Sequence, residues 1–285
     1  MVSQIPRATE SPRRETYTRV EEGTVDSNRI FRPLLWLLIL AGAFFGLAAT
    51  IAPSTFAELT GFKGTDLFTY RLAGAATLAY AIGLVAGTQA SWVELRIPIA
   101  STLVFNAASI FACLLAILAG GAQWLVYVIL LASIVFTAGT WQLLRQPPVA
   151  VAGKARAELE RPIAQWLVAL YVIGVAAAAV FGLGPLLLGG QFGSLVGASG
   201  DDPFVYRQAG AATLGAAAGG ILVLQSRRWS ATRLPTLMAV TFNGLSLIAA
   251  IVEIIRGGPP IAWLILAAAG LTTVGMGLAL ARRGQ

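Results

Sequence analysis

The sequence predicts an all-α integral membrane protein with eight transmembrane helices, built as two parallel four-helix repeats with both termini on the cytoplasmic side. Hydrophobic residues make up 57% of the 285 residues and charged residues only 12%, whereas soluble domains carry about 25% charged residues. Eight separate apolar segments are each about 20 residues long, the length that a helix needs to cross a bilayer. One sequence motif also occurs twice, once in each half of the chain.

The first apolar segment spans about 33–52, which is longer than the core of a signal peptide, about 7 to 15 residues, so we expect it to be retained. The other seven lie at about 67–88, 97–119, 122–144, 162–183, 203–225, 234–256 and 259–281. We therefore expect four parts: a disordered cytoplasmic tail (1–31), a first membrane repeat (32–145), a polar, proline-containing cytoplasmic linker (146–160) and a second membrane repeat (161–285).

The internal repeat is clearest where the second helix of each half begins. Residues 66–78 read DLFTYRLAGAATL and residues 202–214 read DPFVYRQAGAATL, so that ten of the thirteen positions are identical. The pairs Arg32-Pro33 and Arg161-Pro162 also open the two halves alike. Because each repeat has an even number of helices, both repeats should enter the membrane in the same direction, as parallel repeats do.

The distribution of Lys and Arg predicts the orientation. Sixteen of the twenty lie in the tail, in alternate loops and at the C-terminus, and the four others are Lys63, Arg71, Arg207 and Arg256. Cytoplasmic loops carry the excess of positive charge, so both termini should be inside. All seven tryptophans lie near predicted helix ends, as expected of an aromatic belt at the membrane interfaces: Trp36, Trp92, Trp124, Trp141, Trp166, Trp229 and Trp263.

The composition argues against several chemistries. Histidine is absent and Cys113 is the only cysteine, so we expect no metal site, no haem and no other cofactor. No paired intramembrane carboxylates or phosphate-binding glycine motif are present, which favours a non-enzymatic protein. The basic residues that give the net charge of +7 are dispersed, so the expected partner is the lipid bilayer and not nucleic acid.

The repeated motif places an arginine about one turn into a helix in each half. Asp66 and Asp202 are expected N-caps, but Arg71 and Arg207 bring positive charge to the positive end of the helix dipole. The arginines could snorkel to the outer surface or pair with an acid. Alternatively, they could form an anion site facing the outer leaflet, with Tyr70 and Tyr206 beside it.

Each half also carries a polar cluster near the predicted bilayer midplane. Asn106 and Asn243 lie about nine residues into their helices, hence about 13 Å deep, and Ser109 and Ser246 follow three residues later on the same face. Such groups can hydrogen-bond between helices, and they could also line a substrate site. Both roles stay open at this point.

Glu253 is a further candidate because it occurs in one half only. Glu253 and Arg256 are replaced by Ala116 and Ala119 in the first half. An ionisable residue within a membrane helix is a candidate functional residue by default. A local ion pair between Glu253 and Arg256 is the simpler explanation.

Each half resembles the small DoxX-like four-helix membrane modules. The likeness rests on an outer segment, Pro53-Ser-Thr-Phe-Ala-Glu-Leu-Thr-Gly61, followed by Arg71-x-x-Gly74 and by Gly83. Here the module would be present in tandem. The resemblance implies a bacterial inner-membrane module and supplies no catalytic residues.

The leading functional hypothesis is therefore a non-enzymatic inner-membrane protein of one of two kinds. It either binds a small or lipid-like ligand or serves as an accessory or scaffold subunit, with a membrane protein complex or a homo-oligomer as the partner. The alternative is a small transporter with its site between the two repeats, near Asn106 and Asn243.

The charge distribution makes a prediction about topology. Reporter fusions after Thr60 and after Gly121 should report the outer side, whereas fusions after Gly153 and at Gln285 should report the cytoplasm. A cytoplasmic signal after Gly121 would contradict the eight-helix topology.

Overall fold

The computed structural model describes residues 27–148 and 161–283. These residues form ten helices, of which eight are long and apolar enough to cross a membrane. The eight are α1 (Ser27–Ile51), α3 (Leu67–Gly87), α4 (Trp92–Leu118), α5 (Trp124–Arg145), α6 (Gln165–Leu188), α8 (Pro203–Ser226), α9 (Trp229–Ile255) and α10 (Ile261–Arg283). The chain is thus a multi-pass α-helical membrane protein, as its composition predicted.

Two short helices were not predicted from the sequence. They are α2 (Pro53–Thr60), which follows α1, and α7 (Gly190–Leu195), which follows α6. The predicted tail lies outside the described residues up to residue 26, and α1 already begins at Ser27. Most of the predicted linker, residues 149–160, also lies outside the described residues.

α4 and α9 begin five residues before the predicted starts at 97 and 234. Pro98 and Pro235 are the seventh residues of these helices and not the second, as the predicted starts would make them. A proline in the second turn removes a single hydrogen bond close to the helix start, so the helix can continue through it. At the start of α4, Glu94 in the first turn accepts from the backbone N–H of the N-cap residue Ser91, at 3.0 Å from Oε2. This bond completes a capping box and favours the earlier start.

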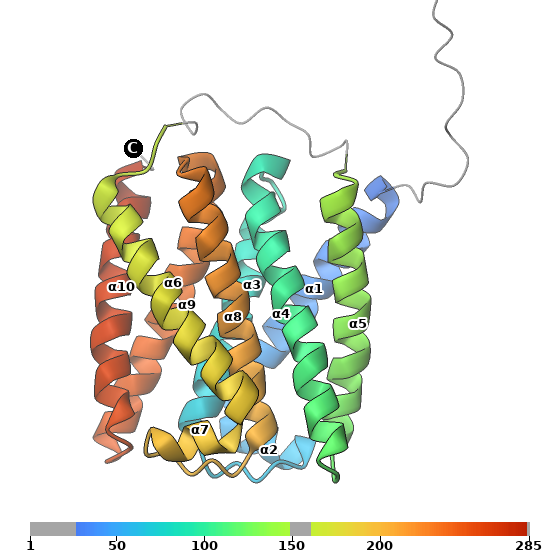
Figure 1. Ribbon diagram of the computed structural model, residues 1–285, viewed down its shortest axis with the longest axis vertical. Coiled ribbons are helices and arrows are strands. Elements are labelled where there is room, and N and C mark those ends of the chain that lie inside the picture. The colour runs from blue at the N-terminus through green and yellow to red at the C-terminus, as the bar shows by residue number, and fades with distance from the viewer. Residues whose placement is uncertain (1–26, 149–160, 284–285) are drawn as a thin grey trace, which may run out of the picture.

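The helices form one bundle with two distinct ends (Figure 1). α2 and α7 lie at one end, here called the α2/α7 end, and the start of α1 and the end of α10 lie at the other, the terminal end. Within each half, the first spanning helix packs on the second and the third packs on the fourth. Between the halves, α3 packs mainly against α9 and α4 against α8, so these four helices form the centre of the bundle.

Small residues allow the helices to approach closely where they cross. A Cβ atom on Gly46 of α1 would lie 2.7 Å from the backbone nitrogen of Leu78 in α3. A Cβ on Gly182 of α6 would lie 3.0 Å from the corresponding atom of Leu214 in α8. The two crossings therefore use corresponding residues of the two halves, and in both a glycine rests on the partner's backbone, as in small-residue packing of membrane helices.

The same crossings show that one predicted correspondence was wrong. If Gly182 is the counterpart of Gly46, the counterpart of Arg32 is Val168, inside α6, and not Arg161. Pro33 lies inside α1, whereas Pro162 precedes α6 and forms an isolated bridge with Arg228. The matching Arg-Pro dipeptides thus occupy different places in the structure.

The two halves are joined along the whole length of the bundle. Near its middle, the Tyr80 hydroxyl of α3 donates to the backbone oxygen of Ala212 in α8 at 2.8 Å, and Gly215 of α8 faces the backbone of Ser101 in α4. At the terminal end, Arg233 of α9 contacts Glu94 Oε1 of α4 through two nitrogens, at 2.9 and 3.0 Å. Glu94 is buried, so this ion pair is partly shielded from water.

Five of the seven tryptophans of the predicted belt are exposed on the surface of the bundle: Trp36, Trp124, Trp141, Trp166 and Trp263. Trp92 is partly buried and packs against the core. Trp229 lies at the start of α9, but only 3% of it is exposed. Its ring packs in the core with Ile163 and Leu167, so it does not contribute to an interfacial belt.

The close crossing of α1 and α3 predicts that Gly46→Ala destabilises the protein. The new methyl group would meet backbone atoms that cannot move aside, and overpacking of this kind costs about 1 to 3 kcal/mol. The melting temperature in detergent should fall. Gly174→Ala in α6 is the matched control, because a Cβ there has open space around it, and this change should leave the melting temperature unchanged or raise it slightly. Equal melting temperatures for the two variants would contradict the packing described here.

Candidate functional site

Arg71 forms an ion pair between the two halves. Its guanidinium lies 3.6 Å from Glu253 Oε2, and the two side chains are 13% and 17% exposed. The local pair of Glu253 with Arg256, expected from their spacing, does not form, because Glu253 instead faces α3. Glu253, which has no equivalent carboxylate in the first half, thus neutralises Arg71 of the first half.

Arg207, the counterpart of Arg71, has a different environment. Among the described residues no carboxylate lies within ion-pairing distance of it. Its Nε atom, like the Nη1 atom of Arg71, is buried without a hydrogen-bond partner. The sequence position that corresponds to Glu253 is Ala116. The guanidinium lies against Gly189, where a Cβ atom would be 3.1 Å from Cζ.

The tyrosines of the repeated motif cross between the halves. Tyr70 donates its hydroxyl hydrogen to Asp202 Oδ2 at 2.9 Å, and Tyr206 donates to Asp66 Oδ2 in the reciprocal arrangement. All four side chains are buried. The two hydroxyl groups are thereby committed to the carboxylates and not to a site beside the arginines.

The two aspartates cap different parts of the chain. Asp66 accepts from the backbone N–H of Thr69 at 3.2 Å and is the N-cap of α3 that the sequence predicted. Asp202 is the N-cap residue of α8, as predicted, but its side chain makes no capping bond to that helix. Its two oxygens instead accept from the backbone N–H groups of Lys63 and Gly64, at 2.9 Å each. Asp202 therefore fixes the turn before α3, in the other half of the chain.

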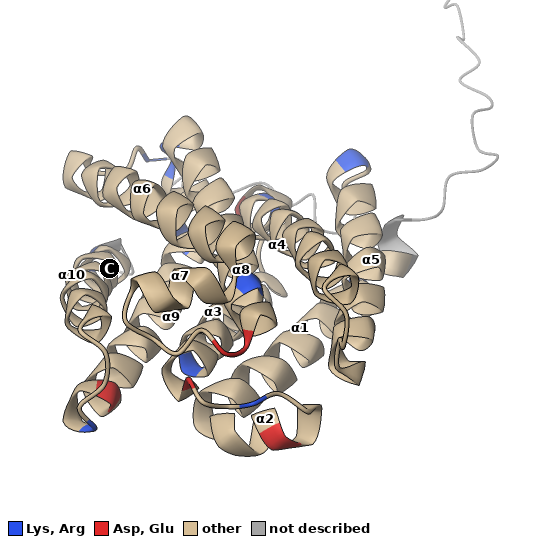
Figure 2. Ribbon diagram, turned by 60° about the horizontal axis from the view of Figure 1, so that its bottom comes forward, with Lys and Arg blue, Asp and Glu red and all other residues tan. Residues whose placement is uncertain are grey.

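An exposed set of contacts surrounds these buried bonds. Lys63 lies 3.5 Å from Asp201, and the Thr65 hydroxyl donates to Asp201 at 2.9 Å and lies 3.1 Å from the Ser199 hydroxyl. The turns before α3 and α8 thus face each other. Figure 2 shows that positive and negative residues gather at such turns, whereas the bodies of the helices carry very few.

The polar residues near the middle of the bundle do not form two equal clusters. Asn106 and Asn243 each donate to the backbone oxygen one turn earlier in their own helix, at 2.8 Å. Ser109 bonds across the halves to Gln208 Oε1 at 2.9 Å, whereas the Ser246 hydroxyl is buried without a partner. Of the four residues, Ser109 alone forms the interhelical bond that the sequence suggested for all of them.

Gln208 is the residue that the sequence analysis missed. It occupies one of the three positions at which the repeated motif differs, and its counterpart in the first half is Leu72. Besides accepting from Ser109, it places its amide nitrogen 3.7 Å from Cys113 Sγ. The sequence did contain a signal for this residue, because a glutamine replaces leucine inside a repeated membrane motif.

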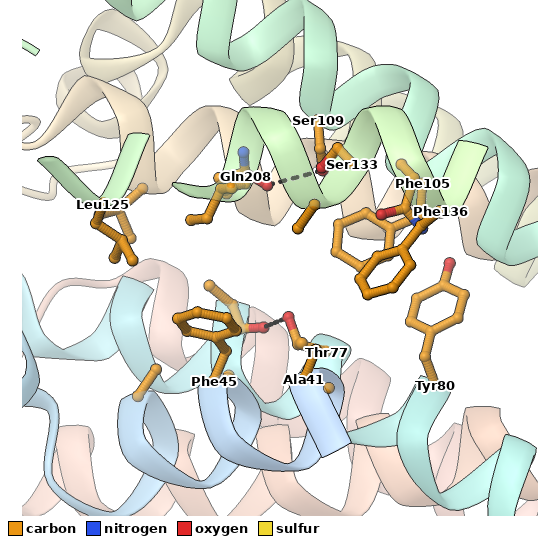
Figure 3. A pocket seen from close by; sticks show the side chains of 18 of the residues that line it. Ala41, Phe45, Thr77, Tyr80, Phe105, Ser109, Leu125, Ser133, Phe136 and Gln208 are labelled. Carbon is orange, nitrogen blue, oxygen red and sulfur yellow. Dashed lines mark hydrogen bonds between the residues drawn. The ribbon is translucent and has the colours of Figure 1, made fainter. Parts of the chain in front are cut away.

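A cavity of about 140 Å³ lies between α1, α3, α4 and α5 of the first half and α8 of the second half, from which Phe204, Val205 and Gln208 line it. Its wall is mostly aromatic and aliphatic, with Phe45, Tyr80 and Phe105 among the lining residues. Figure 3 shows Ser109, Ser133 and Gln208 on one side of the cavity and Ala41 and Phe45 of α1 on the other.

Among the nine sequence-predicted candidates, Tyr70, Asn106 and Ser109 line this cavity. The six that do not line it are Arg71, Arg207, Tyr206, Asn243, Ser246 and Glu253. The candidates are therefore distributed over the cavity, the arginine sites and the tyrosine–aspartate contacts, and do not form one site.

Comparisons of the chain with protein-family models, with curated proteins and with solved structures found no match. The fold and the cavity define a class only, that of a polytopic α-helical membrane protein.

The bonds made by Asp202 predict a large difference between two adjacent carboxylates. Asp202→Asn should lower the melting temperature, because the Asp202 carboxylate accepts one buried and two partly buried hydrogen bonds, and a hydrogen bond to a charged group contributes about 1.5 to 3 kcal/mol. Asp201→Asn is the control, since the Asp201 ion pair is exposed and such pairs contribute at most about 1 kcal/mol. A greater loss of stability in Asp201→Asn would refute the assigned roles.

Proposed function

We propose that the protein binds a small apolar or lipid-like ligand in the cavity between α1, α3, α4, α5 and α8 and has no enzymatic activity. The observation that carries this proposal is the combination of an aromatic-rich wall with a few polar groups, among them Ser109, Ser133 and Gln208. Ligand sites in proteins have this composition, in which apolar surface supplies affinity and a few polar atoms fix orientation.

The position of the cavity is suited to a ligand that arrives through the membrane. α1 and α5 pack together at the terminal end, where Leu34 contacts Gly139. Both helices contribute residues to the wall of the cavity. α1 and α5 also lie at the periphery of the bundle (Figure 1), next to the hydrocarbon region. An apolar ligand could enter between them without crossing water.

The size and the polar groups narrow the ligand class. The cavity is close in volume to the engineered one of about 150 Å³ that accommodates benzene, so it holds a group about the size of one ring. Asn106 uses its amide nitrogen for a bond to Thr102 and keeps its carbonyl oxygen as an acceptor. A ring or short chain that carries a hydroxyl group satisfies both requirements.

The finer architectural predictions are part of this proposal. We infer a tandem duplication of a DoxX-like bacterial inner-membrane module, with parallel halves and cytoplasmic termini. The repeated motif and the matching crossings of Gly46 and Gly182 support the duplication. The charge distribution supports the orientation. Only four of the twenty basic residues lie toward the α2/α7 end, namely Lys63, Arg71, Arg207 and Arg256.

The scaffold and transporter hypotheses stay predictions. A transport site was expected between the repeats near the bilayer midplane. Tyr80, Ala212 and Met238 pack together at that contact, with Phe105 and Phe242 against them. This packing favours ligand binding in the cavity over passage between the halves.

Filling the cavity should abolish binding. Ala132 of α5 lines the cavity, whereas Ala138 of the same helix is exposed on the surface of the bundle. Ala132→Leu should therefore weaken binding of the probe phenol at least about tenfold, and Ala138→Leu should bind it like the wild type. Binding can be measured by the ligand-induced rise in melting temperature in detergent, together with mass spectrometry of molecules that co-purify. Equal binding by both variants would exclude this cavity as the site.

A further inference from the structure

The charge of Arg207 is not balanced within the described part of the chain. Arg207 is the fifth residue of α8, so it lies about 7 Å along the helix from its start at the α2/α7 end. Its side chain is partly buried and its Nε atom is fully enclosed without a partner. Ionisable groups within membrane helices are costly and are found paired with each other or with backbone carbonyls.

The two halves offer an internal comparison. Arg71 occupies the corresponding position in α3 and pairs with Glu253 of α9. α8 packs on α4 as α3 packs on α9, but α4 carries Ala116 where α9 carries Glu253. The first arginine thus has its counter-ion within the protein, and the second lacks the equivalent carboxylate.

The surroundings of Arg207 indicate what could supply the negative charge. The guanidinium rests against Gly189, the junction of α6 and α7, where the absence of a side chain lets the backbone approach. Leu187, Leu188 and Leu195, which flank this junction, are all exposed on the surface of the bundle. A molecule that bridges these apolar side chains and the guanidinium has acyl chains and an anionic headgroup.

We infer that Arg207 binds a phosphate group at the α2/α7 end, with the headgroup of an anionic phospholipid as its main source. A guanidinium can donate two parallel hydrogen bonds to a phosphate, which is a strong and directional contact. The acyl chains then lie over the exposed leucines next to Gly189. Arg207 does not line the cavity proposed above as the ligand site.

The test compares retained lipid in four forms of the full chain. Wild type, Arg207→Gln, Ala116→Glu and Arg256→Gln are purified in detergent, mixed with phosphatidylglycerol or phosphatidylcholine, and examined by native mass spectrometry. Wild type and Arg256→Gln, which removes an exposed charge at the same end, should retain one phosphatidylglycerol in preference to phosphatidylcholine. Arg207→Gln should lose this preference, with binding weakened at least about tenfold. Ala116→Glu should do the same, because it supplies the missing carboxylate from within the protein.

A gain-of-site variant keeps the inference testable if Ala116→Glu does not fold. Glu253→Ala removes the counter-ion of Arg71 and should raise the number of retained phosphatidylglycerol molecules from one to two. Displacement of the lipid by millimolar inorganic phosphate from wild type, but not from Arg207→Gln, would support the anion site and assign free phosphate as a second source. Equal retention of phosphatidylglycerol by wild type and Arg207→Gln would overturn the inference.

Discussion

The close packing of helices across the two halves, α3 on α9 and α4 on α8, is the interaction on which the rest of the structure depends. In lipid there is no hydrophobic driving force between helices, so their association relies on close van der Waals contact and on hydrogen bonds. Gly215 and Ser101 permit the approach of α8 to α4, and Tyr80 adds a hydrogen bond between α3 and α8. The outer helices α1, α5, α6 and α10 then pack around this centre.

Polar contacts reinforce the packing at both ends of the bundle. At the α2/α7 end, Tyr70 and Tyr206 reach the aspartates of the opposite halves, and at the terminal end Arg233 reaches Glu94. Each of these contacts joins residues far apart in the sequence. The halves therefore cannot separate without exposing buried carboxylates that have lost hydrogen bonds, which is costly.

Two differences between the halves lie where binding is proposed. Gln208 replaces Leu72 and reaches Ser109, at the polar side of the cavity. Ala116 replaces Glu253 and leaves Arg207 without the counter-ion that Arg71 has. In a chain with a repeated motif, these substitutions do not disturb the shared packing, because they change side chains and not the glycine contacts at Gly46 and Gly182. These substitutions therefore give the two halves different polar groups although their helices pack in a similar way.

The sequence by itself determined the class of protein, the eight spanning segments and the residues worth examining, because length, hydropathy and charge distribution are local properties of the chain. It could also identify Asp66 as a helix cap, since that bond spans only three residues. Only the tertiary structure decided that Asp202 fixes the turn before α3, that Glu253 pairs with Arg71 and not with Arg256, and that Trp229 is buried. These outcomes depend on which helices become neighbours, and the spacing of residues within one helix does not determine which helix packs against it.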